Sequence, residues 1–416
     1  MIRPTTIGAF LVCAVAIQIH ATTITVINNN DSGPGSLRQA LADAHESDTI
    51  DFGPALKGET ITLTTAELGI NKSITISGPG PNLLAVSRLQ NAPAFRIFNV
   101  VAGLTVVIQG LTISNGSATE FGCGGGILDE GSSLSLIDCT VSGNSTDGTG
   151  GGICADGNAT LTIDSSTVSG NYAGDYGGGL ANGGTLIINN STLSDNRGEF
   201  AAGAILNGFN GEASLTVSNS TLSGNTTQLH GGGIFNGGQS TLSNSTLSGN
   251  SGMTAGAIVN RLGTLDIEST ILNRGEVGPN ILNDSGTVTS HGYNLSSDDG
   301  GGILNGPGDQ INTNPVLGPL QNNGGPTFTH ELLPGSPAID AGDPNFTPPP
   351  FFDQRGQGFP RAVNGRIDKG SFEVQSGGTP TPTSTPTATP TPTARPTPTP
   401  RPQPSVRPRP TPAPRP

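Results

Sequence analysis

The chain has 416 residues, of which 63 are Gly and 33 are Pro, while aromatic residues make up 4% and Trp is absent. Ordinary globular proteins contain about 7% Gly and 5% Pro, so this composition excludes a conventional domain with an aromatic-rich core. The formal net charge is −13, and setting aside the six Arg of the two terminal segments leaves −19 for residues 22–378. Such an acidic body is a poor partner for nucleic acid or an anionic membrane surface.

The first 21 residues have the pattern of a secretory signal peptide. Arg3 precedes an apolar run from Ile7 to Ile17, and Ala21 is a small residue at the expected cleavage point. The run is too short to span a bilayer, and no later run is long enough. Cys13 lacks the small preceding residue of bacterial lipoprotein signals. We therefore predict export to the extracellular space or the cell envelope surface, and a mature chain without a transmembrane segment.

Residues 22–56 are predicted to cap the start of a solenoid. The stretch "TTITVI" reads as a strand, and a short amphipathic helix follows it. Ser36 and Gln39 are spaced as a capping box. The apolar stripe of this helix consists of Leu37, Ala40, Leu41 and Ala44. A lid of this kind would cover the unpaired strand edges of the first coil.

Residues 57–282 contain a repeat of 24 to 29 residues whose most regular form is "NSTLSGN". Its Gly, Ser, Thr and Asn are poor helix formers, and apolar residues alternate with polar ones. We predict an all-β fold, a right-handed parallel β-helix with three strands per coil, in which equal positions stack along the axis. One inward column comprises Val141, Val168, Leu193, Leu222, Leu247 and Ile271. A second comprises Ile127, Ile153, Leu180, Ile205, Ile234 and Ile258.

Polar residues recur in the same manner and are interpreted as scaffold. An inward small-residue column comprises Cys139, Ser166, Ser191, Ser220, Ser245 and Ser269. One Asn column comprises Asn144, Asn171, Asn196, Asn225 and Asn250, and is interrupted at Arg274. A second comprises Asn182, Asn207, Asn236 and Asn260, with Asp129 at its start. Stacked Asn side chains at corners tolerate turn conformations and can hydrogen-bond along the axis.

The mature chain keeps three cysteines, Cys123, Cys139 and Cys154. An odd number without metal-like spacing argues against a disulfide framework and against a zinc site. Cys139 is interpreted as a small core residue in the serine column.

The C-terminal third loses the repeat. Residues 283–376 are predicted to form last coils and a Gly/Pro-rich cap that closes the far end of the solenoid. Residues 377–416 are rich in Pro, Thr and Arg, a composition that predicts a disordered tail of polyproline character.

Three stretches resemble known families. "DSGPGSLRQALADA" (31–44) resembles the signature of bacterial exported proteins named for a Cys-Ser-Leu-Arg-Glu-Ala hexapeptide, from which it differs at Gly35 and Gln39. The repeats resemble those of polymorphic outer membrane proteins, although Leu222 stands where their motif has Phe. Residues 314–343 and 353–373 are similar to the choice-of-anchor Q domain. The resemblance implies an exported, surface-associated β-helix, and it carries over no catalytic residues.

No enzyme site is evident in the sequence. Polysaccharide lyases and hydrolases need clustered carboxylates, commonly with Ca²⁺ or a nearby Arg or Lys, and the acids here are scattered. We predict no catalytic residue, no metal site and no cofactor, and the sequence does not support Ca²⁺ binding. The segments that join each corner Asn to the next Gly-rich patch differ between coils. They define a candidate ligand face that comprises Tyr172, Asp175, Tyr176, Arg197, Glu199, Phe200 and His230.

The function predicted from these observations is that of a structural or adhesive surface protein. Its partner would be an extracellular polysaccharide or a surface protein, bound through this loop face. The alternative is a carbohydrate-active lyase or hydrolase. A remote alternative, ice binding, depends on two hydroxyl columns that are predicted to face outward. These are Thr140, Thr167, Thr192, Thr221, Thr246 and Thr270, with Ser142, Ser169, Ser194, Ser223 and Ser248.

Overall fold

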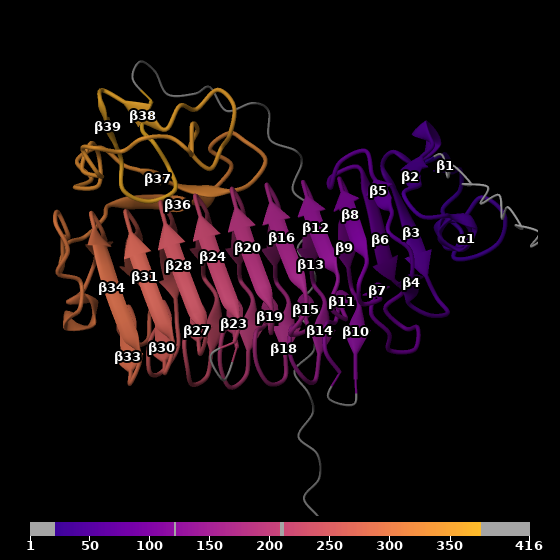
Figure 1. Cartoon of the computed structure of the whole chain (residues 1–416), viewed down its shortest axis with the longest axis horizontal. Coiled ribbons are helices and arrows are strands. Elements are labelled where there is room, and N and C mark those ends of the chain that lie inside the picture. Colours follow the sequence, from indigo (N-terminus) through magenta and orange to yellow (C-terminus); the bar gives the residue numbers. More distant parts are fainter. Residues whose placement is uncertain (1–20, 120–121, 209–211, 376–416) are drawn as a thin grey trace, which may run out of the picture. The chain divides into compact units, whose positions relative to one another are not determined.

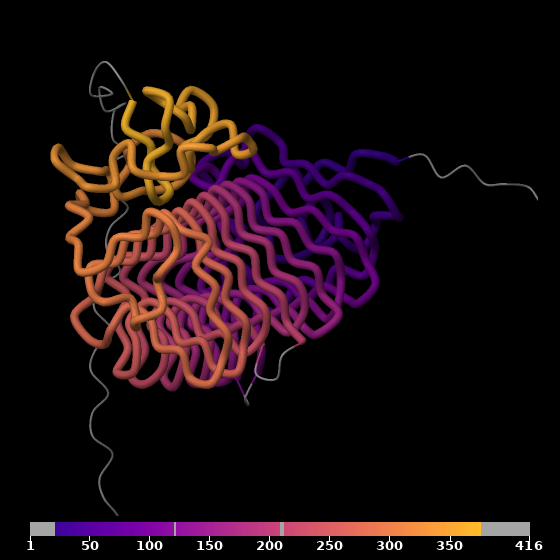
Figure 2. Tube along the Cα trace, turned by 60° about the vertical axis from the view of Figure 1, so that its left-hand side comes forward, coloured from indigo at the N-terminus to yellow at the C-terminus, as the bar shows by residue number. Residues whose placement is uncertain are grey.

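The computed structural model describes residues 21–375 except 120–121 and 209–211. The predicted signal peptide and the predicted tail at 377–416 lie outside the described residues, apart from Ala21. Within the described part, the chain winds into the predicted right-handed parallel β-helix (Figure 1). Successive coils stack along the solenoid axis, and each strand pairs in parallel with its counterpart in the next coil (Figure 2). The predicted fold class is therefore confirmed.

Four parallel sheets make up the walls among the described residues. Sheet A contains β1 (Thr23–Val26), β2 (Thr49–Phe52), β5 (Thr75–Ser77), β8 (Thr105–Gln109), β12 (Ser133–Ile137), β16 (Thr160–Asp164), β20 (Thr185–Asn189), β24 (Ser214–Ser218), β28 (Gln239–Ser243), β31 (Thr264–Glu268) and β34 (Thr287–Gly292). Sheet B contains β3 (Glu59–Leu63), β6 (Leu84–Arg88), β9 (Thr112–Ser114), β13 (Thr140–Ser142), β17 (Thr167–Ser169), β21 (Thr192–Ser194), β25 (Thr221–Ser223), β29 (Thr246–Asn250), β32 (Ile271–Arg274) and β35 (Leu295–Ser296). Sheet C contains β4 (Leu68–Ile70), β7 (Phe98–Val100), β11 (Ile127–Asp129), β15 (Ile153–Ala155), β19 (Leu180–Asn182), β23 (Ile205–Asn207), β27 (Ile234–Asn236), β30 (Ile258–Arg261) and β33 (Ile281–Asp284).

Sheet D is a short addition to the predicted three strands per coil. It occupies the variable segments between sheets B and C, and its strands have two residues each. They are β10 (Ser117–Ala118), β14 (Ser145–Thr146), β18 (Tyr172–Ala173), β22 (Arg197–Gly198) and β26 (Thr226–Thr227). The Gly-rich patch after this sheet lies so close to the neighbouring coil that a Cβ on Gly151 would overlap the carbonyl oxygen of Tyr172.

The apolar core is the predicted stack of like residues. Leu193 pairs with Leu222, which pairs with Leu247, and all three are fully buried. The isoleucine column of sheet C is in register in the same way from Ile127 to Ile258. Because neighbouring strands lie about 4.8 Å apart, each side chain packs directly on its counterparts above and below.

Both predicted Asn columns are hydrogen-bonded ladders. From Asn144 to Asn250, each Nδ2 donates to the Oδ1 one coil further on at 2.9–3.0 Å. In all four rungs the main-chain N–H of the donor residue also donates to the same oxygen. The second ladder runs from Asn182 to Asn260 and continues to Asn283. Asp129 does not start it, because Ala155 stands between them in the register.

The predicted alignment is wrong by one residue in the last full repeat. Thr246 pairs with Ile271, and Leu247 pairs with Leu272. Leu272 therefore continues the inner column, while Ile271 faces outward into a separate apolar cluster. Thr270 takes the place predicted for Ser269, since its hydroxyl donates to the carbonyl two residues earlier as Ser245 does. A β-bulge in β29, where Asn250 pairs with Arg274, accompanies this change.

The predicted N-terminal helix is α1 (Leu37–Asp43), and its apolar stripe is buried. The capping box is only half formed. The Ser36 hydroxyl accepts from the Gln39 N–H at 3.2 Å, but the Gln39 side chain donates to Asp43 instead of returning to Ser36. The short 3₁₀ helix η1 (Pro54–Leu56) follows β2. No helix in the described ranges is long and apolar enough to cross a membrane.

Residues 315–375, which we call the C-terminal cover, fold back along the solenoid instead of closing its far end. They contain the antiparallel pairs β36 (Leu317–Gln321) with β37 (Thr329–Leu332) and β38 (Ala362–Val363) with β39 (Arg366–Ile367). In Figure 2 this segment, orange to yellow, lies against one side of the coils. The preceding turn, with 3₁₀ helix η2 (Gly300–Gly302), instead places Leu304 against the solenoid core.

The cover contacts the outward face of sheet B, which corrects the prediction of two exposed hydroxyl columns. The Thr192 hydroxyl donates to the carbonyl of Phe328, and the Thr221 hydroxyl donates to Gln354 Oε1 at 2.6 Å. Thr246 accepts from the Ser371 N–H at 3.0 Å. The buried hydroxyl residues of this face are Thr192, Ser194, Thr221, Ser223, Thr246 and Ser248. No continuous hydroxyl face remains on sheet B.

A buried ionic core holds the cover together. Arg355 forms an ion pair with Asp353 at 2.5 Å and lies between the rings of Phe359 and Phe372. Arg361, fully buried, donates to Asn244 Oδ1 of the solenoid at 3.0 Å. The residues that carry the choice-of-anchor Q resemblance thus attach the cover to the coils.

Leu222→Ala tests the stacked core. Removing this side chain should lower the free energy of unfolding by about 2–5 kcal/mol, because a cavity opens between two packed neighbours. Chemical denaturation measures the loss. Thr241→Ala on the exposed face of sheet A is the control and should change stability by less than about 0.5 kcal/mol. A loss below about 1 kcal/mol for Leu222→Ala would contradict the stacked core.

His330→Asn tests the attachment of the cover. The His330 Nδ1–H donates to Gly318 O at 2.7 Å, so Nε2 accepts from the Ser223 hydroxyl at 2.9 Å. Burial lowers the pKa of His330 below its ordinary 6.5, more than the Gly318 bond raises it. Below about pH 6.5, His330 binds a proton in the unfolded chain more readily than in the folded chain. The free energy of unfolding therefore falls as the pH drops below this value.

The measurement is the free energy of unfolding at several pH values between 5 and 8. Wild type should lose stability toward pH 5 relative to His330→Asn, with a slope difference of at most ~1.4 kcal/mol per pH unit. Parallel pH profiles for the two proteins would show that His330 does not contribute in this way.

Candidate functional site

Sheet D brings three residues of the predicted ligand face together. Tyr172 of β18 pairs in register with Arg197 of β22. Glu199 accepts from the Tyr172 hydroxyl at 3.2 Å and from Arg197 at 2.9 Å. The Gln228 side-chain amide donates to the same carboxylate. These side chains form a polar group on the solvent side of the sheet, where such ion pairs contribute little to stability.

A second group of predicted residues lies at the edge of sheet C. Tyr176, Ala201 and His230 follow one another as bridge partners in three successive coils. The rings of Tyr176 and Phe200 are 6.1 Å apart, and His230 Nδ1 lies 3.1 Å from the Thr254 hydroxyl. Asp175, by contrast, is joined to its neighbours through main-chain hydrogen bonds. The predicted face is thus divided into a polar group and an aromatic edge.

The outward face of sheet C is apolar, a feature that the sequence analysis missed. An outward column consists of Leu128, Cys154, Ala181, Leu206, Phe235 and Val259. Tyr176 packs against this column, and the His230 ring lies 6.4 Å from that of Phe235. The sequence signal was the middle residue of "ILD", "ICA", "LAN", "ILN", "IFN" and "IVN", which is apolar or Cys in every coil.

A groove of about 340 Å³ runs over this column. Its floor is formed by Cys154, Ala181 and Leu206, on three adjacent strands. Cys123 and Thr149 form one rim, and the other consists of turn residues that include Asp156 and Glu212. The groove therefore combines an apolar floor with polar margins, as ligand sites commonly do.

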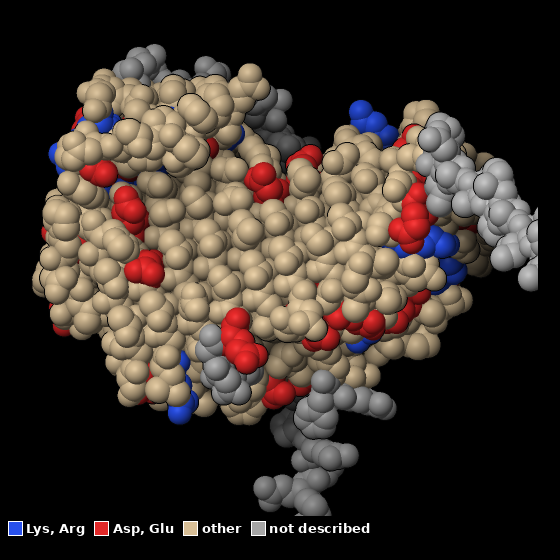
Figure 3. Space-filling model, viewed as in Figure 1, with Lys and Arg blue, Asp and Glu red and all other residues tan. Residues whose placement is uncertain are grey.

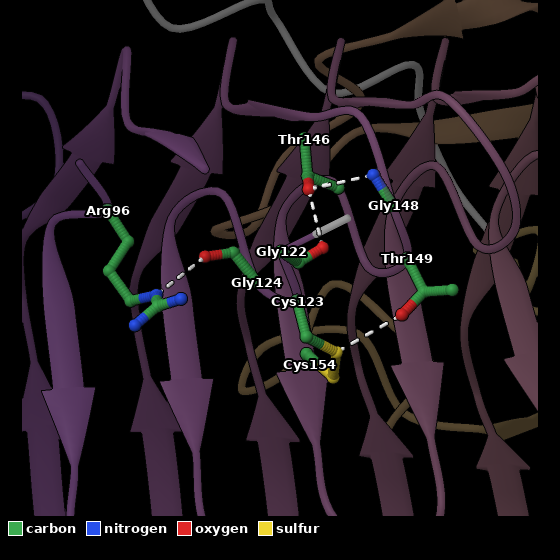
Figure 4. Close-up of a disulfide and its surroundings, with 8 residues drawn as sticks. All are labelled: Arg96, Gly122, Cys123, Gly124, Thr146, Gly148, Thr149 and Cys154. Atoms are coloured by element: carbon green, nitrogen blue, oxygen red, sulfur yellow. Dashed lines mark hydrogen bonds between the residues drawn. A yellow bond between two sulfur atoms is a disulfide. The ribbon is translucent and has the colours of Figure 1, made fainter. Parts of the chain in front are cut away.

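A disulfide between Cys123 and Cys154 lies in this groove, which contradicts the prediction drawn from the odd number of cysteines. Thr149 Oγ1 is 3.1 Å from Cys123 Sγ (Figure 4). The loop that carries Cys123 is also held by Thr146, whose hydroxyl donates to Gly122 O at 2.7 Å, and by Arg96, which donates to Gly124 O at 3.3 Å.

Cys139 is the odd cysteine, and it is buried in the serine column as predicted. Its N–H donates to the Ser166 hydroxyl at 2.9 Å, as the N–H of Ser166 does to Ser191. Burial raises the pKa of its thiol to about 11, so the thiol stays protonated.

The groove has an acidic margin. The turns between sheets C and A carry Glu130 after β11, Asp156 after β15 and Glu212 before β24. In Figure 3, acidic side chains gather along the lower edge of the visible face, with few basic ones among them. This charge disfavours an acidic ligand. No group of three or more candidate metal-ligating side chains occurs in the described ranges.

Comparisons with known proteins concern the fold. Residues 98–251 match a family model described as a right handed beta helix region. This stretch is a right-handed β-helix. No curated protein matches the chain. Among solved structures, the chain is similar to the one titled "Crystal structure of pectate lyase Pel9A", with 14% identity and a TM-score of 0.47 over 86% of this chain and 98% of that one. At this identity the similarity says nothing about the reaction or substrate of this chain.

Cys123→Ser tests the contribution of the disulfide. The bond spans 31 residues of sequence, so its loss should lower the free energy of unfolding by about 2–4 kcal/mol. Cys139→Ser is the matched control, because Ser166 occupies the same position in the next coil, and it should cost less than about 1.5 kcal/mol. Equal stability of Cys123→Ser and wild type under oxidising conditions would show that the bond does not constrain the chain.

Proposed function

We propose that the protein acts outside the cell as a surface-associated β-helix that binds an uncharged polysaccharide through the groove on sheet C. The observation that carries this proposal is an apolar column on the outer side of a β-helix wall. From Cys154 to Val259 this column is more than nine-tenths buried, so its accessible part is the groove, whose apolar floor and polar margins are typical of a ligand site. The resemblance to choice-of-anchor Q proteins and the signal-peptide pattern support an exported, surface-associated role.

The shape and charge of the groove indicate the class of ligand. Its floor crosses three coils, which suits an extended chain better than a compact molecule. The aromatic edge formed by Tyr176 and Phe200 offers flat apolar surfaces, and Asp156 and Glu212 supply hydrogen-bond acceptors. Because these acids would repel a polyanion, an uncharged polysaccharide fits better than an acidic one. A surface protein is the competing occupant.

Ala181→Trp tests the groove. Its side chain lines the floor, so an indole there should fill the groove and weaken binding at least tenfold while the coils stay intact. Binding of the mature chain to uncharged polysaccharides is measured by co-sedimentation and calorimetry, with an acidic polysaccharide for comparison. Thr140→Trp, on the outward face of sheet B and away from the groove on sheet C, is the matched control and should bind as wild type does.

The joint replacement of Tyr176, Arg197 and Phe200 by Ala extends this test to the loop face beside the groove and should also weaken binding at least tenfold. Wild-type binding by both the groove-filling and the loop-face variants would refute the proposal. Preferential binding of the acidic polysaccharide, or of a surface protein alone, would refute the assigned ligand class.

A further inference from the structure

We infer that a second groove, on the outward face of sheet A, is a hydrolytic site for uncharged polysaccharide. It has a volume of about 400 Å³, and its polar lining consists of Thr241 and Ser243 of β28, Asp266 and Glu268 of β31, and His291 of β34. The groove lies on a different wall from the groove on sheet C and shares none of its lining residues.

Strand geometry places the two carboxylates on one face. Asp266 and Glu268 are alternate residues of β31, so both side chains point outward and their Cα atoms lie roughly 6.6 Å apart along the strand. Thr241 is the neighbour of Asp266 on β28, and Ser243 is the neighbour of Glu268. Each carboxylate thus has a hydroxyl beside it on the adjacent strand.

A β-bulge brings His291 to this pair. Ile267 pairs with Ser290 and Glu268 pairs with Gly292, so His291 is the extra residue of β34. Its Nε2 lies 2.9 Å from Asp266 Oδ1. A bulge changes the direction of a side chain relative to the regular strand, and bulges are common beside active sites. A strand without this insertion would not place the imidazole beside Asp266.

The hydrogen bond assigns roles to the three groups. When Asp266 accepts from Nε2–H, the other ring nitrogen, Nδ1, is left to exchange a proton with a bound molecule. Asp266 is then a positioning residue. His291 in its protonated form can donate from Nδ1, and ionised Glu268 can accept a proton. Glycoside hydrolysis requires an acid at the bridging oxygen and a base or nucleophile at the anomeric carbon, and His291 and Glu268 supply one group of each kind.

The reaction balances with water as the only co-reactant. Glu268 takes a proton from a water molecule whose oxygen bonds to the anomeric carbon. The bond from that carbon to the bridging oxygen breaks, and His291 gives its Nδ1 proton to that oxygen. The products are two shorter chains, one with a new reducing end. Exchange with solvent then removes the proton from Glu268 and returns one to His291.

The wall that leads to the groove indicates the substrate. From β8 to β28, the outward side chains of sheet A are mostly hydroxyls and amides, and Asp164 is the one charged residue among them. Figure 3 shows this part of the visible face largely free of charge, with acidic atoms near its left end. The groove lining contains no Lys or Arg to neutralise a polyanion. An uncharged, hydroxyl-rich polymer fits such a surface.

The test measures new reducing ends released by the mature chain from mixed-linkage β-glucan, xylan, galactomannan and amylose between pH 4 and 8. At least one polymer should be cleaved, with a bell-shaped pH dependence. Glu268→Gln and His291→Asn should each lower the rate about a hundredfold or more. Glu276→Gln, in the exposed segment between β32 and β33, is the control and should stay within twofold of wild type.

The positioning role of Asp266 has a separate readout. Asp266→Asn should lower the rate and alter the acid–base limbs of the pH profile, and Asp266→Glu should restore part of both. All four substituted positions are at least partly exposed, so thermal unfolding should stay within a few degrees of wild type. No cleavage of any of the four polymers by wild type, or equal rates for wild type and Glu268→Gln, would overturn the inference. Neither result depends on binding at the groove on sheet C.

Discussion

The architecture depends on hydrogen bonds that run along the solenoid axis between identical side chains. The Asn196 side chain, for example, donates to Val168 O of the preceding coil and to Asn225 Oδ1 of the next. Its Oδ1 accepts from the main-chain N–H and the side-chain amide of Asn171 in the preceding coil. Burying an amide is costly unless all its donors and acceptors have partners. A one-residue change of register would leave several of them without partners at once. The ladders therefore hold the register, while the apolar columns supply most of the driving force for folding.

This arrangement explains why much of the solenoid could be predicted from the sequence. Period-two alternation and a 24- to 29-residue repeat were sufficient to place Leu193, Leu222 and Leu247 in one column, because a stacked fold converts sequence period into spatial contact. The prediction failed at Ile271, because the step from Leu247 to its partner is 25 residues and not 24, and a bulge before Asn250 restores the predicted alignment at Arg274. Amino-acid composition does not indicate where a bulge occurs. For this reason the sequence also did not predict the position of His291, which is the extra residue of a bulge in β34.

Long-range contacts could not be predicted from the repeat, for a different reason. Gln354 contacts Thr192 across 162 residues of sequence, and nothing in the spacing of either residue indicates its partner. The disulfide joins Cys154, an outward residue of sheet C, to a loop residue in the preceding coil, so counting cysteines could not pair them. The loop face was located through its variability, but the groove beside it depends on outward apolar residues that resemble ordinary core residues in the sequence.

The C-terminal cover also bears on how such a chain can change in length. It contacts β21, β25 and β29 at fixed positions, and Lys369 reaches the carbonyl of Asn294 further along the axis. Duplicating or deleting a coil inside that span would move these contacts apart by one strand spacing, about 4.8 Å. Coils that precede β21 have no such restriction. Insertion or deletion of whole coils during evolution should therefore be tolerated in the N-terminal half of the solenoid, because the C-terminal cover does not span the coils there.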